Sequence, residues 1–479
     1  MRKIWSIVAL GVLGVAPLSV GAETLTDALI SAYRNSHLLE QNQAVLRAAD
    51  EDLASAVGAL LPVFSWEASI NASGSYSPQA QTDFFGNAQP QQTPISTSDM
   101  LGLFATITIL DFGRGQLNIE LKNSLVRASQ HSLVYIEQQV LQDAMSAYVN
   151  VGLQERLVAA QQKLVQIIIK DLAAEKDRFD VGEVTRTDVA LAEARLATAN
   201  SQLAAAQGGY DVARENYKAA IGHYPSGTSS LPAHPTTAKS LNAAREIALR
   251  THPAILQAQE QAKASDIAVE LARAQMQPNV TGQASLQQSY SDRGNSDGNA
   301  FTGGQASAIS ENLAITLRQT IYQGGQLSSQ LRKQIAQSQS AHSSLLQTVV
   351  NVDEAVGRAW SNIIVSKASI IAGDQQIVAE KAAYDGVRQE AELGSRTTLD
   401  VLDAERNLLT ANTTRLQAGA NLYVSEYALL SAMGLLTASH LRLGVPIFDP
   451  SAYLNAVKHA PATTARGAKL DRILKTLGK

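Results

Sequence analysis

Cysteine is absent from this chain of 479 residues, which is also poor in aromatic residues and in net charge. Without cysteine there is no disulfide framework, no thiolate metal site and no acceptor for N-terminal lipidation. A net charge of −4 argues against nucleic-acid binding, so no nucleic-acid partner is expected. Aromatic residues make up 5%, whereas alanine, glutamine, serine and leucine recur in long stretches. This balance is typical of long helices that pack closely through small side chains.

Long hydrophobic runs are also missing, apart from a short one at the N-terminus. Arg2 and Lys3 precede an apolar run, Ile4 to Ala16, and small residues follow up to Ala22. This layout predicts a cleaved signal peptide over residues 1–22. Its apolar core is too short for a membrane-spanning helix, which needs about 20 apolar residues. An exported chain without a later span is either periplasmic or, in a bacterium with an outer membrane, part of a β-barrel.

The sequence contains two similar halves. Gly182–Gly222 aligns without a gap to Gly394–Gly434 at an offset of 212 residues, and Leu25–Pro62 aligns to Leu241–Pro278 at an offset of 216. Chance similarity of alanine-rich helices explains matched alanines, but it does not explain matched glycine, proline and aspartate residues at element boundaries. We therefore predict an internal duplication, with repeats over 23–222 and 239–434, a linker over 223–238 and a C-terminal segment with a mobile tail over 435–479.

Each half begins with the same predicted elements. A helix is expected from Leu25 to Leu61, with a copy from Leu241 to Gln277, and the proline that follows stops it. Apolar and polar residues alternate directly afterwards, which predicts β-hairpins over 63–110 and 279–321. Each strand has one apolar and one polar face, as expected between lipid and a wet interior. A soluble antiparallel sheet is the alternative interpretation of the same alternation.

Each half ends with two helices that form a hairpin. The first is very long, over about 116–179 and 326–392, and carries apolar residues at coiled-coil spacing. Gly182 and Gly394 suit the C-terminal caps of these helices. A shorter helix then returns from Asp188 or Asp400, with Thr187 or Thr398 as a possible N-cap.

Four strands per chain cannot close a barrel, and a membrane tolerates no open sheet edge. The predicted barrel must therefore be shared between chains. Three chains would give twelve strands.

The order of these parts and three turn motifs carry a family resemblance. The motifs are Tyr322-Gln323-Gly324-Gly325-Gln326, Phe179-Asp180-Val181-Gly182 and the segment Leu393-Gly394-Ser395-Arg396 with its continuation to Ala404. Together they resemble the TolC family of outer-membrane channel proteins, over about Glu23 to Gly444. Gly182, Gly394, Gly324 and Gly325 are the turn glycines of this pattern.

The resemblance implies an α+β membrane protein that works as a homotrimer. Its twelve-stranded β-barrel would lie in outer-membrane lipid, continued into the periplasm by a long α-helical coiled-coil barrel with an equatorial region. Such channels are exit ducts for an inner-membrane transporter, joined through a periplasmic adaptor, in drug efflux, type I protein secretion or both. The channel itself catalyses nothing and needs no cofactor.

The resemblance also implies roles for residues at the periplasmic tip. Asp400 and Asp403 share a helix face, and in the family the aspartates at these positions ring the narrow entrance, where they would favour cations. From the residues alone, acids in a first helical turn equally well complement the helix dipole. Because Leu191 stands where the first half would carry the second acid, the ring should be threefold.

Gating links at the tip are expected from the same resemblance. Thr187, Asp188 and Arg396 match positions that link neighbouring helix hairpins in the closed family member. The family's tyrosine near the second turn is Ala391 here, so its bond to Asp188 cannot form and the mouth is latched differently or relies more on Arg396.

No catalytic constellation is found, and the eight histidines show no metal-ligand spacing. We therefore expect no enzyme and no metal site. A periplasmic coiled-coil scaffold or adaptor without a pore remains the alternative function, and an outer-membrane enzyme is a third, weaker one.

Overall fold

The computed structural model describes residues 23–74, 85, 95–227, 232–293 and 304–458, together with 469, 472 and 476. The predicted signal peptide, most of the connection between the two strands of each predicted β-hairpin, and most of the C-terminal tail lie outside these described residues. The chain forms two compact units, each built from both halves of the sequence. Unit 1 comprises Met1–Glu40, Val134–His252 and Asn351–Ile447, and unit 2 comprises Gln41–Leu133, Pro253–Val350 and Phe448–Lys479.

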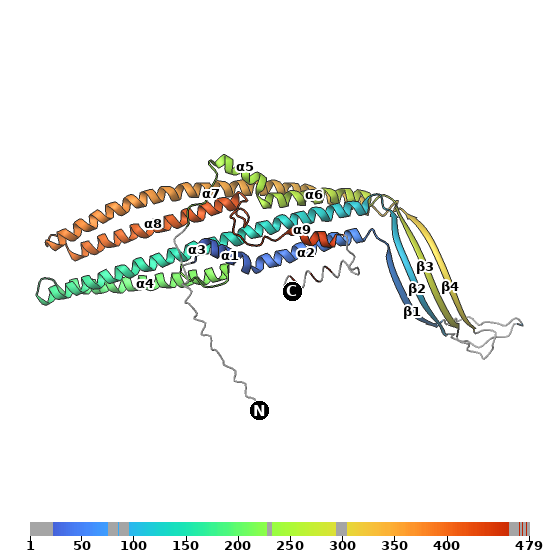
Figure 1. The fold of residues 1–479 in the computed structure, drawn as a ribbon, viewed down its shortest axis with the longest axis horizontal. Coiled ribbons are helices and arrows are strands. Elements are labelled where there is room, and N and C mark those ends of the chain that lie inside the picture. Colours follow the sequence, from blue (N-terminus) through green and yellow to red (C-terminus); the bar gives the residue numbers. More distant parts are fainter. Residues whose placement is uncertain are drawn as a thin grey trace, which may run out of the picture. The chain divides into compact units, whose positions relative to one another are not determined.

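The order of elements repeats along the chain, which confirms the internal duplication (Figure 1). The first half contains α1 (Leu25–Asn35), α2 (His37–Gly58), β1 (Val63–Gly74), β2 (Ile95–Leu110), α3 (Arg114–Asp180) and α4 (Arg186–Ile221). The second half contains α5 (Leu241–Thr251), α6 (Pro253–Ala274), β3 (Asn279–Arg293), β4 (Gly304–Arg318), α7 (Gln326–Glu392) and α8 (Thr398–Ala432), and α9 (Pro450–Val457) follows. Helices α3 and α7 have 67 residues each.

The first helix of each half was predicted as one continuous helix, and this prediction is wrong. Ser36 interrupts the first helix, where its side-chain oxygen accepts a hydrogen bond from the Leu39 amide at 3.2 Å and so caps α2. His252 occupies the equivalent place in the second half and is extended, because Pro253 disfavours the helical conformation in the residue before it. The proline that begins α6 was the missed sequence signal.

In unit 2, four antiparallel strands form one sheet in the order β1-β2-β3-β4. The register places Trp66 opposite Leu103, and Leu103 opposite Leu286, on one face of the sheet. The same face carries large exposed apolar side chains from all four strands, among them Phe64, Trp66, Ile70, Leu101, Leu103, Ile107, Leu286, Ile309, Leu313, Ile315 and Leu317. The predicted alternation is therefore confirmed, and β4 ends three residues before the predicted end of the hairpin at 321.

In unit 1, α3 runs beside α4, and α7 runs beside α8, as two antiparallel hairpins (Figure 1). Ion pairs join the helices of each hairpin, from Lys176 to Glu193 at 2.9 Å and from Arg415 to Asp374 at 2.9 Å. Alanines such as Ala144, Ala199 and Ala411 are almost completely buried, as expected for helices packed through small side chains.

Away from the hairpin turns, unit 1 has an aromatic core. The Tyr217 hydroxyl donates to the Glu23 carboxylate at 2.6 Å, and the Tyr148 hydroxyl donates to the Glu23 carbonyl at 2.8 Å. Both rings are almost fully buried. The first described residue of the chain is thus anchored to α3 and α4. Among the described helices, none is both long enough and apolar enough to cross a membrane.

Candidate functional site: the paired hairpin turns

The two hairpins of unit 1 end in turns of the same construction. Gly182 and Gly394 adopt φ values of +80° and +77°, a conformation that glycine reaches without steric cost. In the first turn the Glu183 amide donates to the Arg178 carbonyl, and in the second turn the Ser395 amide donates to the Glu390 carbonyl, both at 2.9 Å. These bonds satisfy the last carbonyls of α3 and α7 and reverse the chain.

The returning helices start with capping boxes, but not at the predicted threonines. Thr185, not Thr187, is the N-cap of α4, and Thr397, not Thr398, is the N-cap of α8. The reason lies in the spacing, because a capping box needs its acid three residues after the cap. Asp188 and Asp400 stand at that distance from Thr185 and Thr397.

Asp188 and Asp400 therefore have a local role in the single chain. The Asp400 carboxylate accepts hydrogen bonds from the Thr397 amide at 3.0 Å and from its hydroxyl at 2.9 Å. These bonds hold the pKa of Asp400 below its ordinary value, and the equivalent bonds from Thr185 do the same for the pKa of Asp188. Both acids therefore remain charged at neutral pH and face the positive end of a helix dipole.

The other predicted tip residues lie nearby with different partners. Arg396 donates from Nε to Glu390 at 2.9 Å, a bond within its own hairpin, and this contact raises the pKa of Arg396. Thr187 lies in the first turn of α4 and is exposed. Gly324 and Gly325 form the β4–α7 turn in unit 2, with φ values of +55° and +80°. The four predicted turn glycines thus belong to two different kinds of turn.

Among the described residues, two side-chain hydrogen bonds connect the first hairpin to the second, and the sequence patterns did not predict either. Arg195 on α4 donates to Asp403 on α8 at 3.1 Å. The Thr398 hydroxyl on α8 donates to the Glu175 carboxylate on α3. Thr398 is free for this contact because Thr397 provides the cap. Both contacts are specific to these helices, since the repeat offset of 212 puts Asn407 at the place of Arg195 and Val387 at the place of Glu175.

Two carboxylates in this part of unit 1 are buried. Glu175 on α3 and Glu405 on α8 are 3% and 7% exposed. Each has one buried oxygen, Oε2, without a hydrogen-bond partner among the described residues. Burial and the nearby Asp171 charge raise the pKa of Glu405 to about 7, and burial also raises the pKa of Asp171. Ionisation of these acids is therefore unfavourable in the folded protein. An apolar cluster also joins the two hairpins here, formed by Leu164, Val165, Ile168, Ala199 and Leu402.

A cleft of about 600 Å³ lies between the two turns. It is lined from both hairpins, by Asp188, Leu191 and Arg195 of α4, by Arg396 of the second turn and by Leu399 of α8. Apolar, acidic and basic groups are mixed along its walls. Among the described residues, no group of three His, Cys, Asp or Glu side chains is placed to hold a metal ion.

The capping boxes make a testable contribution to the turns. Thr397→Ala removes the side-chain oxygen that accepts from the Asp400 amide, and we expect a local loss of about 1 kcal/mol. Hydrogen exchange of the amides at 398–402 should rise about fivefold, because 1 kcal/mol corresponds to that ratio. Thr185→Ala should have an equal effect at α4. Thr348→Ala, within α7, is the control and should leave both turns unchanged; unchanged exchange in Thr397→Ala would contradict the capping role.

Comparison with known proteins identifies the family. The profile described as Outer membrane efflux protein matches residues 29–223 and 244–435, one match in each half of the chain. The chain belongs to the outer membrane efflux protein family. The efflux protein BepC of Brucella suis biovar 1 is 31% identical over 445 residues, covering 93% of this chain and 92% of BepC. The TolC protein of Escherichia coli K12 is 25% identical over 492 residues, covering 98% of this chain and 94% of TolC.

Solved channels share the fold of this outer membrane efflux protein. The CmeC outer membrane channel of Campylobacter jejuni superposes with a TM-score of 0.72 at 15% identity, over 96% of this chain and 97% of CmeC. The open state of the MtrE channel of Neisseria gonorrhoeae gives a TM-score of 0.67 at 20% identity, over 86% of this chain and 89% of MtrE. The predicted TolC-like fold is thereby confirmed.

Family membership also decides the location and the class of the protein. BepC and TolC are outer membrane proteins, and the family is one of outer membrane efflux channels and not of enzymes. The predicted outer-membrane location is therefore confirmed, and so is the absence of an enzymatic role.

Proposed function

We propose that three copies of the chain assemble into one exit duct, which passes substrate from an inner-membrane transporter, through a periplasmic adaptor, to the outside. The single observation that carries this proposal is the four-stranded sheet with one apolar face and two edge strands, β1 and β4. An open edge with unpaired backbone groups is not tolerated in lipid. Pairing β4 of one copy with β1 of the next satisfies both edges and closes a barrel of twelve strands.

The exposed side chains of α7 support the same assembly. Ile364, Ile371 and Val378 recur every seven residues and are 57%, 61% and 71% exposed in the single chain. A stripe of this period is the seam of a left-handed coiled coil. A neighbouring copy supplies the helical partner that the stripe needs. A periplasmic scaffold without a pore would leave the apolar face of the sheet in water, which disfavours that alternative.

At the tip, the proposal gives Asp400 and Asp403 a second role besides capping and ion pairing. Three copies would bring six carboxylates to one narrow mouth and make it selective for cations. The Arg195–Asp403 pair neutralises part of this charge in the single chain. Rupture of that pair would both separate the hairpins and expose the Asp403 charge to the passage. Thr187, Asp188 and Arg396 are the proposed gating positions.

The cleft between the two turns is the proposed contact for a helical hairpin of the adaptor. Its mixture of Leu191 and Leu399 with Arg195 and Asp188 suits an amphipathic helix tip of the partner. The proposal covers drug efflux and type I protein secretion, because a passive duct takes its cargo and its energy from the transporter.

The test of the duct is an assembly and conductance measurement. The mature protein extracted in detergent should have the mass of a trimer by light scattering and should conduct ions in a planar bilayer. A monomer that remains soluble without detergent would refute the duct and support the scaffold.

Arg396→Ala should loosen the mouth and raise the mean conductance. The ion pair to Glu390 is about half exposed on both sides, so solvent screens it and its loss should raise the open population only modestly. Glu390→Ala should act in the same direction, because it breaks the same pair. The exposed pair of Arg358 and Glu354 on α7 provides the control, Arg358→Ala. An unchanged time-averaged conductance of single Arg396→Ala channels would reject the gating role.

A further inference from the structure

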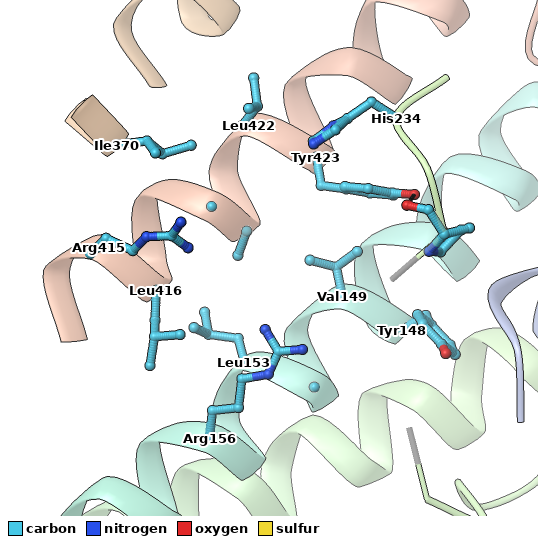
Figure 2. Close-up of a pocket in the computed structure, with 14 residues that line it drawn as sticks. Tyr148, Val149, Leu153, Arg156, His234, Ile370, Arg415, Leu416, Leu422 and Tyr423 are labelled. Atoms are coloured by element: carbon cyan, nitrogen blue, oxygen red, sulfur yellow. Dashed lines mark hydrogen bonds between the residues drawn. The ribbon is translucent and has the colours of Figure 1, made fainter. Parts of the chain in front are cut away.

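A cavity in unit 1 lies between α3 and α8, away from the hairpin turns. Its volume is about 380 Å³, within the range of small-molecule sites. It is lined by Val149 and Leu153 of α3, by Leu416 of α8 and by Pro232 and His234 of the segment before α5. Figure 2 shows His234 beside Tyr423. Tyr423 forms an aromatic wall, with the His234 ring 5.3 Å from it between centroids. The interior is thus apolar with one aromatic side.

Two glycines explain why there is space between these helices. Gly152 on α3 and Gly419 on α8 both line the cavity and carry no side chain into it. A Cβ atom built at Gly419 meets only the Arg415 guanidinium, at 3.8 Å, which is ordinary contact. The glycine is therefore not required for close approach of backbones. It leaves room in the cavity, and a larger side chain at this position would fill that room.

Two arginines, one from each helix, give the cavity a positive side. Arg156 extends from α3 and Arg415 from α8 into the space shown in Figure 2. Arg415 uses Nε to bind Asp374 at 2.9 Å, which leaves its terminal nitrogens for another acceptor. In the part of the chain that the structure describes, Arg156 has no carboxylate within ion-pair distance, and no acid lines the cavity. Guanidinium groups bind carboxylates and similar anions in bidentate geometry.

The internal duplication shows that these features do not belong to the repeated plan. At the offset of 212, Arg156 corresponds to Ala368 and Arg415 corresponds to Leu203. The two glycines correspond to Ile364 and Gln207. Both charges and both space-making glycines are thus present only on the α3–α8 side. Helix packing alone does not require these residues, because the equivalent helices α7 and α4 pack with other residues at the same positions.

We propose that this cavity binds an amphipathic organic anion, with its carboxylate or sulfonate held by Arg156 and Arg415 and its aromatic or aliphatic body against Leu153, Leu416 and Tyr423. The apolar surface of Leu153, Leu416 and Tyr423 disfavours inorganic anions, because they have no apolar group to bury against it. The positive side selects against neutral and cationic amphiphiles. The bound anion joins α3 of the first hairpin to α8 of the second. The site does not depend on the exit-duct proposal, because all of its residues belong to one copy of the chain.

The test measures binding of naphthoate to the full mature protein in lipid nanodiscs by calorimetry, with empty nanodiscs as the reference. Naphthylmethanol, the neutral analogue, and inorganic sulfate are the comparison probes. Naphthoate should bind saturably, about tenfold or more tightly than either comparison probe, because a hydrogen-bonded charge pair contributes that much to affinity. Equal binding of naphthoate and naphthylmethanol would overturn the role of the arginines. Equal binding of sulfate would overturn the role of the apolar surface.

Three variants locate the site. Arg156→Gln and Arg415→Gln should each weaken naphthoate binding about tenfold and leave naphthylmethanol binding unchanged. Gly419→Leu keeps both charges but fills the cavity, so it should abolish binding of naphthoate. Arg358→Gln removes an exposed arginine of α7 and is the matched control. Thermal unfolding of each variant, followed by circular dichroism, checks that it is folded. Naphthoate binding unaffected by Gly419→Leu would refute this location even if the arginine variants bind weakly.

Discussion

Arginine in place of Leu103 is expected to prevent the protein from assembling in the outer membrane. Leu103 lies on β2 between Trp66 and Leu286, in the centre of the apolar face, and is 60% exposed in the single chain. An arginine on the lipid face near the middle of a bilayer costs about 2–4 kcal/mol per chain. Three copies share one barrel in the proposed assembly, so the cost enters three times. Heat-modifiable oligomer in the outer-membrane fraction should fall below detection.

The matched control is Thr106→Arg on the same strand. Thr106 is also exposed, but the register places it with Val63 and Gln283 on the opposite face, where polar residues dominate. A charge on a wet face has a small cost, so this variant should assemble as the natural protein does. If both variants assembled equally well, the sheet would not have its apolar face in lipid. If both failed, the polar face would not line a wet interior.

Glu405→Gln is expected to stabilise the contact between the hairpins at high pH and to have little effect at low pH. Burial and the nearby Asp171 charge raise the pKa of Glu405 to about 7 from an ordinary value of 4.5. The folded protein therefore holds this proton more strongly than the unfolded chain does. Stability from this group is fully present below pH 4.5 and is lost as pH rises through 7. The loss at pH 8 amounts to about 3 kcal/mol.

The groups that face Glu405 come from two helices packed against α8, namely α3 and α7. Asp171 on α3 opposes its ionisation, while Lys163 on α3 and Arg388 on α7 favour it. Tyr384 on α7 is also close, since the Glu405 charge raises the pKa of that phenol. Lys163 and Arg388 do not balance the negative charge around Glu405, because Asp171 and Glu175 are also acidic. Low pH therefore stabilises the packing of α3 against α8, and high pH weakens it.

Hydrogen exchange of the segments 164–176 and 398–409, measured at pH 5 and pH 8 and corrected for intrinsic rates, tests this expectation. Protection in the natural protein should fall between the two pH values, and Glu405→Gln should remove much of that fall. Glu354→Gln takes away an exposed carboxylate on α7 and should keep the pH dependence of the natural protein. A Glu405→Gln protein with the same pH dependence as the natural one would show that this buried acid does not set the strength of the packing of α3 against α8.

Much of the fold could be predicted from the sequence because periodicity reports directly on which side of an element is buried. Strand alternation at Phe64, Trp66 and Ile70 indicated an apolar face, and the register confirms it across four strands. The apolar spacing of α3 and α7 gave both long helices to within two residues. The breaks at Ser36 and His252 were missed because the apolar pattern continues across them, so only local capping and Pro253 mark the interruption.

The candidate site was predicted less completely, for a different reason. The sequence shows the acids at 188 and 400 as helix-start residues, but periodicity does not tell which threonine closes a capping box. Arg195 and Glu175 gave no signal, since each looks like a charged residue on a long amphipathic helix. Their partners, Asp403 and Thr398, lie more than 200 residues away in the other half. Contacts of this kind arise from the way two helices face each other, which one sequence without its structure does not specify.

The equal lengths of α3 and α7 have a consequence for how this chain can evolve. Loss of one residue from the middle of α7 would pull its turn back by about 1.5 Å and rotate it by about 100°, because each residue of an α-helix contributes that rise and rotation. Asp403 would then face away from Arg195, and the apolar seam of α7 would point elsewhere. Losses or gains of seven residues nearly restore the rotation but change the height of one turn against the other. The two long helices can therefore change length only together, so substitutions are tolerated along them far more readily than insertions or deletions.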